Sequence, residues 1–192
     1  MIKTQIGLGL AAIGRPEYIN IRTDNSIDKS EDAFKKNALS VLNEAYKLGV
    51  RYFDTAPSYG KGEAFLQEWN DVNNHYDAVL GTKWGYTYVA NWKLGFDGKH
   101  EVKEHSVEKL EEQWDVSKQL LPRLKYYQVH SATFESGILE NEAVLNQLYQ
   151  INLVIYLLME AKMMMNMYII MIIIIPLMRN ILRKMKMNQK LE

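Results

Sequence analysis

The 192-residue sequence contains no cysteine and only four histidines, His75, His100, His105 and His130. Without cysteine, disulfide scaffolds, thiolate nucleophiles and cysteine-ligated metal sites are excluded. No two histidines are four residues apart, so the helical histidine pair of many zinc sites is absent and we expect no metal. A basic excess is also absent, because 23 Lys and Arg face 23 Asp and Glu; we therefore expect no nucleic-acid partner.

Glycine is absent from residues 151–192, although the whole sequence holds 11 glycines. The same segment holds nine of the ten methionines. Its six basic and two acidic residues give it a net charge of +4, which leaves −4 for residues 1–150. We therefore interpret residues 1–150 as an α/β domain and residues 151–192 as an aberrant, apolar tail rich in Met and Ile.

The tail contains 16 consecutive uncharged residues, 163–178, followed by a basic cluster. One interpretation is a membrane anchor. However, a spanning helix needs about 20 residues, and Pro176 interrupts this run. We favour a frameshift or truncation, because an A/T-rich gene read out of frame encodes an excess of Ile, Met, Asn, Lys and Tyr. On this interpretation we expect a cytoplasmic protein that does not associate with membranes.

Apolar strand-like segments alternate with amphipathic helical segments in the first 150 residues. The patterns predict strands over residues 6–13, 50–53, 78–82 and 126–129, and helices over residues 34–48, 65–72, 106–121 and 142–150. We favour a strand over a signal peptide for the first apolar run, because it is rich in glycine and follows a single basic residue. Residues 85–104 are expected to form a long loop that could act as a lid.

This alternation predicts a parallel sheet with right-handed crossover connections. Two architectures have that property, the doubly wound sheet and the (β/α)8 barrel. The first strand lacks the G-x-G-x-x-G spacing, so a dinucleotide site of the doubly wound type is not supported.

Three of the expected strands end on an ionisable residue, namely Asp54, Lys83 and His130. Tyr59 follows Asp54 in the same loop. Each residue alone has an ordinary structural explanation, such as turn initiation or packing. The carboxyl ends of parallel strands meet on one face, however, so we expect the four side chains to converge there.

A phenol, an ammonium, a carboxylate and an imidazole together suit the reduction of a carbonyl group. The phenol keeps its proton at neutral pH, and a nearby ammonium stabilises the phenolate. Tyr59 could then protonate a carbonyl oxygen, Asp54 could hold Lys83, and His130 could orient the oxygen. No side chain supplies hydride, so a nicotinamide cofactor is required. The alternatives are a barrel aldolase with Lys83 as Schiff-base amine, and a non-catalytic remnant that binds a partner or a membrane.

The segment FDTAPSYG, residues 53–60, resembles the Asp-Thr-Ala-x-x-Tyr-Gly segment of the aldo-keto reductases. The segments LGLAAIG (8–14), GTKWG (81–85) and YQVHS (127–131) resemble the family's first, third and fourth strands, in the family's order. The resemblance covers about residues 5–150. It implies a (β/α)8 barrel that reduces aldehydes, ketones or sugars with NADPH, or alternatively NADH.

By position, the resemblance implies that Tyr59 is the proton donor, with Lys83, Asp54 and His130 around it. It places Gly9, Leu10, Ala11 and Asp54 near the cofactor, and a small carbonyl substrate beside Trp84 and Tyr86. The sequence departs from the family past residue 150, where we find no counterpart of the later strands. Such a barrel typically has about 250 residues, so four βα units are present and four are missing.

The gene tests the frameshift interpretation directly. Translated in a shifted frame, the codons after about 150 should encode strand five onward for about 100 residues, with glycine and polar residues restored. If neither other frame stays open over that length, the frameshift interpretation is wrong.

Overall fold

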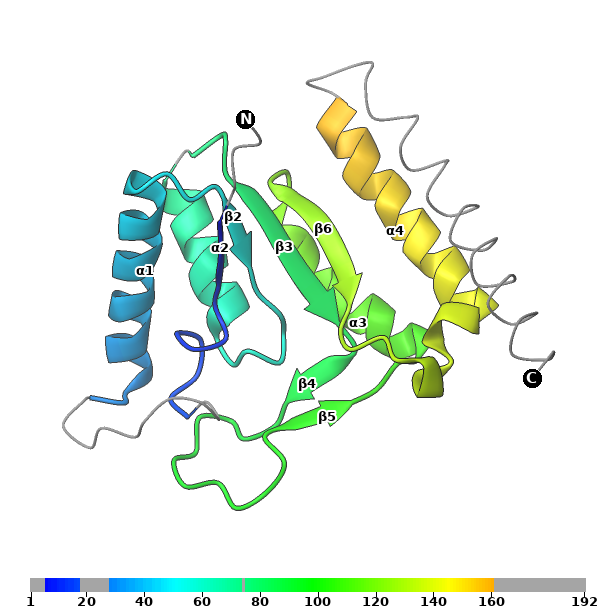
Figure 1. The fold of residues 1–192 in the computed structure, drawn as a ribbon, viewed down its shortest axis with the longest axis horizontal. Coiled ribbons are helices and arrows are strands. Elements are labelled where there is room, and N and C mark those ends of the chain that lie inside the picture. Colours follow the sequence, from blue (N-terminus) through cyan, green and yellow to red (C-terminus); the bar gives the residue numbers. More distant parts are fainter. Residues whose placement is uncertain (1–5, 18–27, 74, 161–192) are drawn as a thin grey trace, which may run out of the picture. The chain divides into compact units, whose positions relative to one another are not determined.

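The computed structural model describes residues 6–17, 28–73 and 75–160, with side chains up to residue 152 (Figure 1). The strands are β1 (Gly7–Gly9), β2 (Tyr52–Asp54), β3 (Val79–Trp84), β4 (Tyr86–Tyr88), β5 (Glu101–Lys103) and β6 (Leu124–Val129). The α-helices are α1 (Glu31–Lys47), α2 (Gly62–Val72), α3 (Val107–Ser117) and α4 (Glu142–Glu160). The tail, 161–192, lies outside the described residues.

The main sheet has four parallel strands in the order β1-β2-β3-β6. Each crossover between them contains a helix, as the alternating pattern predicted. The strand order follows the chain without reversal, so this sheet lacks the switch point at which doubly wound folds bind their ligands. The predicted α/β class with a parallel sheet is confirmed.

Helix starts follow from local capping chemistry. The Ser30 hydroxyl accepts a hydrogen bond from the Ala33 N–H at 3.3 Å, and Glu31 and Asp32 occupy the first turn of α1. Ser106 caps α3 in the same way through the Lys109 N–H at 3.1 Å. These oxygens satisfy amide groups that otherwise lack partners at a helix start.

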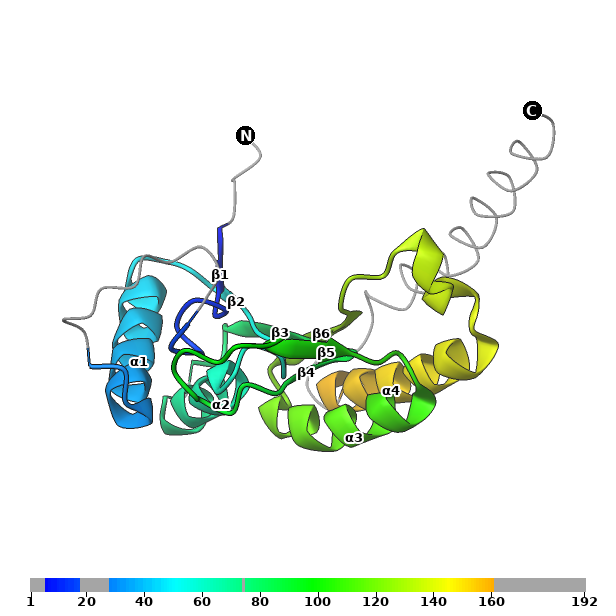
Figure 2. The same ribbon diagram turned by 90° about the horizontal axis from the view of Figure 1, so that it is seen from below.

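The core lies between one face of the sheet and the helices, which Figure 2 shows on a single side of it. Phe53 and Leu80 point from the sheet into this layer, where they meet Leu42 of α1 and Leu66 and Trp69 of α2; all are at most 1% exposed. Because side chains alternate along a strand, the neighbours of Phe53 and Leu80 point to the opposite face. No described helix covers that face.

Several predicted boundaries are wrong, for local reasons. The first strand ends at Gly9 and not at residue 13, because the Gly14 N–H turns back to the Leu10 carbonyl at 2.9 Å. The expected loop 85–104 contains the antiparallel pair β4–β5, which is too short to show an alternating pattern. Helix α4 continues to Glu160, beyond the predicted end at residue 150.

Glu63, in the first turn of α2, is a buried carboxyl group at the contact between helices and sheet. Its Oε1 accepts hydrogen bonds from Thr82 Oγ1 at 2.8 Å and Ser117 Oγ at 2.7 Å. Desolvation outweighs these two donors and raises the pKa of Glu63 above its ordinary value.

Glu63→Gln should therefore flatten the pH dependence of stability. A raised folded-state pKa means that the carboxyl contributes most stability below about pH 4.5, and that this contribution is lost as pH rises through the folded-state pKa. We expect the wild type to lose stability relative to the variant between pH 4.5 and neutrality, measured by urea denaturation at several pH values. If the difference in free energy of unfolding between the two proteins stayed constant with pH, the raised pKa of Glu63 would be contradicted.

Among the described residues, no helix combines the length and the apolar composition needed to cross a membrane. The apolar run that suggested an anchor, residues 163–178, is not among them.

Candidate active site at the carboxyl ends of the strands

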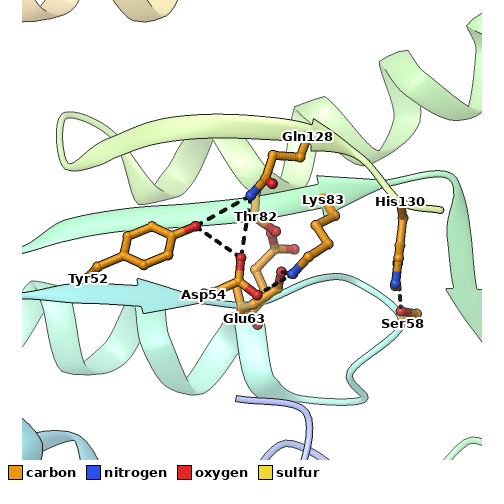
Figure 3. A network of polar contacts seen from close by, with 9 residues as sticks. Tyr52, Asp54, Ser58, Glu63, Thr82, Lys83, Gln128 and His130 are labelled. Atoms are coloured by element: carbon orange, nitrogen blue, oxygen red, sulfur yellow. Dashed lines mark hydrogen bonds and ion pairs between the residues drawn. The ribbon is translucent and has the colours of Figure 1, made fainter. Parts of the chain in front are cut away.

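The uncovered face of the sheet carries polar side chains in a row at the carboxyl ends of its strands. Alternation places Asp54 of β2, Lys83 of β3 and Gln128 of β6 on this face, opposite the core. His130 follows Gln128 by two residues and continues the row. Figure 3 shows these side chains close together, so three of the four predicted catalytic residues meet as the topology required.

Asp54 and Lys83 form an ion pair between neighbouring strands. Their side chains are 22% and 16% exposed, so water screens the pair only in part. Lys83 Nζ also donates to the Thr55 carbonyl at 3.1 Å. Asp54 Oδ1 accepts from Tyr52 Oη at 3.2 Å, and burial together with this carboxylate raises the pKa of Tyr52 to about 12. Lys83 is thus held between the Asp54 carboxylate and the Thr55 carbonyl.

Tyr59 lies in the turn between β2 and α2, where it completes the predicted set. The Lys83 Nζ lies 4.9 Å from the centroid of the Tyr59 ring. The turn packs tightly on the loop after β1, because the Lys61 N–H donates to the Gly14 carbonyl at 2.7 Å. A Cβ at Gly14 would come within 2.8 Å of the Gly62 backbone, so only glycine permits this approach.

His130 contacts rings from two other elements. Its ring centroid lies 5.8 Å from that of Tyr59, edge to face, and 4.7 Å from that of Tyr86. Partial burial and the Lys83 ammonium together lower the pKa of His130 from its ordinary value. The imidazole is therefore neutral at pH 7 and can donate one hydrogen bond.

The β4–β5 hairpin forms a wall beside these residues. Tyr86 on β4 faces His130, and Glu101 on β5 forms an ion pair with Arg15 at 3.3 Å. The buried Gln113 of α3 anchors the hairpin by accepting from the Gly85 N–H at 2.8 Å and donating to the Tyr86 carbonyl at 2.9 Å. The segment expected to be a long loop thus contains a hairpin that is hydrogen-bonded to α3, and its role as a lid stays a prediction.

The other predicted binding residues are placed differently. Gly9 pairs with Asp54 in register, and a Cβ there would meet nothing within 4 Å, so open space adjoins it. The Leu10 side chain is fully buried in the core, so only its backbone lies near the row of polar side chains. Ala11 beside it is partly exposed. Trp84 is also fully buried and points to the helix side of β3. Its predicted contact with substrate stays a prediction.

Three polar residues near the site were not singled out in the sequence. Ser58 lies 3.4 Å from His130 Nδ1, Gln128 lies 3.5 Å from Asp54, and Tyr52 lies 3.2 Å from the same carboxylate. The alternation of residues 126, 128 and 130 could have indicated Gln128. Nothing in the sequence indicates the contact of Ser58 with His130, because it joins residues 72 positions apart.

No group of three or more metal-ligating side chains occurs in the part of the chain that the structure describes. The polar side chains at the carboxyl ends of the strands, which we call the rim, are suited to hydrogen bonding and proton transfer.

Comparison with known proteins accords with this geometry. Residues 5–154 match the model of the aldo/keto reductase family. The chain is 31% identical over 136 residues to the uncharacterized oxidoreductase YqkF of Bacillus subtilis, an alignment that covers 64% of this chain and 39% of that protein.

Two solved structures of Pseudomonas aeruginosa proteins assigned to the aldo-keto reductases also match. Both superpose with a TM-score of 0.54, at 25% and 26% identity. Each match covers 75% of this chain and 48% or 49% of the other chain. The chain thus spans about half the length of these relatives, and it belongs to the aldo/keto reductase family.

Proposed function

We propose that the rim formed by Asp54, Tyr59, Lys83 and His130 reduces a carbonyl group on a small aldehyde, ketone or sugar. The observation that carries this proposal is the ion pair between Asp54 and Lys83 beside the Tyr59 ring. It sets a positive charge next to the phenol that would lose a proton. The family relationship supports an oxidoreductase, and the choice of substrate is our proposal.

Each side chain has a separate role in this reaction. Tyr59 donates its phenolic proton to the carbonyl oxygen as the carbon is reduced. Lys83 stabilises the phenolate that remains, and Asp54 keeps the ammonium oriented towards it. His130, neutral at the rim, donates a hydrogen bond to the same oxygen and so stabilises the developing negative charge.

The residues present fit a nicotinamide cofactor, which members of this family typically use. The fit rests on the open space beside Gly9 at the end of β1, next to the polar row begun by Asp54. The backbone of Gly9, Leu10 and Ala11 and the carboxylate of Asp54 would hold this group. When bound, the nicotinamide supplies the hydride. We propose NADPH, with NADH as the alternative.

The sheet of this chain corresponds, in our proposal, to the first half of an eight-stranded barrel. Its strand order follows the chain, as in a barrel wall, and the polar row lies at the carboxyl ends of the strands, where the active sites of such barrels lie. The remaining cofactor contacts would come from the half of the family's length that these 192 residues do not span. An ammonium tied to a carboxylate does not favour the aldolase alternative, which needs a neutral amine.

The proposal is tested by fusing residues 1–158 to the C-terminal half of the Pseudomonas aeruginosa relative. We expect the fusion to oxidise NADPH with 4-nitrobenzaldehyde, monitored by NADPH absorbance. We expect no turnover by the 192-residue chain alone, because a loosely held hydride donor loses the advantage of positioning.

Two results would contradict these expectations. A correctly folded fusion that binds NADPH but reduces no carbonyl compound would count against the proposed role of the rim. Steady turnover by the 192-residue chain would show that four βα units suffice. Borohydride trapping of a substrate on Lys83 would instead support the aldolase alternative.

A further inference from the structure

Ser58 connects the Tyr59 turn to His130. It is fully buried, and its Oγ lies 3.4 Å from Nδ1 of His130 (Figure 3). Its carbonyl oxygen accepts a hydrogen bond from Nη1 of Arg15 at 3.2 Å. One residue thus contacts the imidazole with its side chain and a buried guanidinium with its backbone.

The Arg15 guanidinium fixes where the Ser58 backbone lies. Arg15 is 3% exposed, and two of its nitrogens each lie 3.3 Å from Oε1 of Glu101 on β5. A planar guanidinium that meets a carboxylate and a carbonyl at once has little freedom to rotate. It therefore holds the Ser58 carbonyl between the loop after β1 and the hairpin, and this sets the position from which the hydroxyl reaches His130.

The direction of the Ser58–His130 hydrogen bond follows from the donors and acceptors available. A buried hydroxyl needs an acceptor for its proton. Among the described residues, His130 Nδ1 is the acceptor within hydrogen-bond distance of Ser58 Oγ. If Nδ1 carried the proton, two donors would face each other or the hydroxyl proton would lack a partner. Ser58 is therefore the donor, and the neutral ring carries its proton on Nε2.

We propose that Ser58 is a positioning residue that fixes His130 in the tautomer protonated at Nε2, leaving that N–H to donate to a substrate carbonyl. The tautomer follows from contacts within this chain. Only the substrate carbonyl as the acceptor of the Nε2–H rests on the proposed function. The other charged and titratable groups that act on His130 are Lys83, Asp54, Glu101 and His105. Of these, Lys83 and His105 disfavour the imidazolium, and Asp54 and Glu101 favour it.

Long-range proton–nitrogen NMR of the full ¹⁵N-labelled chain tests the proposal, because the two neutral tautomers give different cross-peak patterns. The His130 signals are identified by their loss in His130→Gln. In the wild type we expect the pattern of a ring protonated at Nε2. In Ser58→Ala we expect a mixture of tautomers and a His130 pKa raised by about half a unit to one unit, because a bond that favours the neutral ring is lost.

Three further variants separate positioning from general effects. Ser58→Thr keeps the hydroxyl and should retain the wild-type pattern. Lys83→Met should raise the pKa of His130 without changing its tautomer. Ser136→Ala removes a partly buried hydroxyl that donates to the Thr133 carbonyl at 2.6 Å and accepts from the Ile138 N–H at 3.4 Å. Neither contact involves His130, so this variant should change neither property.

A wild-type ring protonated at Nδ1 would overturn the proposal, even if Ser58→Ala did not fold. An unchanged tautomer in a folded Ser58→Ala would overturn it as well. Absence of turnover in the fusion protein would bear on the proposed function alone, since the imidazole spectrum does not depend on catalysis.

Discussion

Tyr59→Phe should reduce turnover of the fusion protein about 10²–10⁴-fold, because the loss of a general acid typically has this effect. NADPH binding, measured by quenching of tryptophan emission, should stay nearly unchanged, since the phenol acts on the transition state and not on the cofactor. Lys83→Met should lower turnover to a similar extent. It removes the positive charge that lies 4.9 Å from the Tyr59 ring and stabilises the phenolate.

Tyr126→Phe is the matched control for this result. Tyr126 lies on the same face of the sheet, on β6, but it is 54% exposed and precedes the carboxyl end of its strand. Loss of its hydroxyl should reduce turnover far less than Tyr59→Phe does, because Tyr126 lies before the carboxyl end of its strand and away from the place where the carbonyl group would bind. If Tyr126→Phe and Tyr59→Phe reduced turnover equally, the proposed role of Tyr59 as proton donor would be wrong.

Trp69→Ala should destabilise the domain by about 3–5 kcal/mol, at the upper end of single core substitutions. Trp69 is 1% exposed, and its ring centroid lies 4.8 Å from that of Phe53. Its Nε1–H also donates to Asn43 Oδ1 at 2.8 Å, so truncation leaves a cavity and an acceptor without its partner. Because domains are stable by only about 5–15 kcal/mol, we expect partial or complete unfolding, measured by urea denaturation monitored by circular dichroism.

Val72→Ala provides a control on the same helix. Val72 is 76% exposed, so its truncation should change the free energy of unfolding by about 0.5 kcal/mol or less. A Trp69→Ala chain as stable as Val72→Ala would show that the layer between α2 and the sheet does not stabilise this domain.

The family and the main elements could be predicted from local patterns alone. An apolar run that ends on Asp54, Lys83 or His130 identifies a strand and its carboxyl end, and intervening helices impose parallel pairing. Parallel pairing then brings those ends to one rim without further information. The convergence of Asp54 and Lys83 was predictable for this reason, and the ion pair between them confirms it.

The side to which each residue points was decided by tertiary structure. Trp84 follows Lys83 directly, so the alternation that puts Lys83 on the rim puts Trp84 in the core. Leu10 is buried because the chain turns at Gly14, where a backbone contact with the Tyr59 turn admits no side chain. A motif shows which residues occur together, but the strand's alternation decides on which side of the sheet each side chain lies.

Short-range patterns also could not show contacts between distant segments. The β4–β5 strands are three residues each and exist because they pair with each other and are anchored by Gln113. The bonds from Arg15 to Glu101 and from Ser58 to His130 join residues 86 and 72 positions apart. The sequence by itself determined the family, the α/β class and the residues that meet at the rim, because strand ends and parallel crossovers are local signals. Only the tertiary structure decided how the Tyr59 turn, the hairpin and His130 are held together, because burial and the pairing of buried donors with acceptors depend on the whole packed chain.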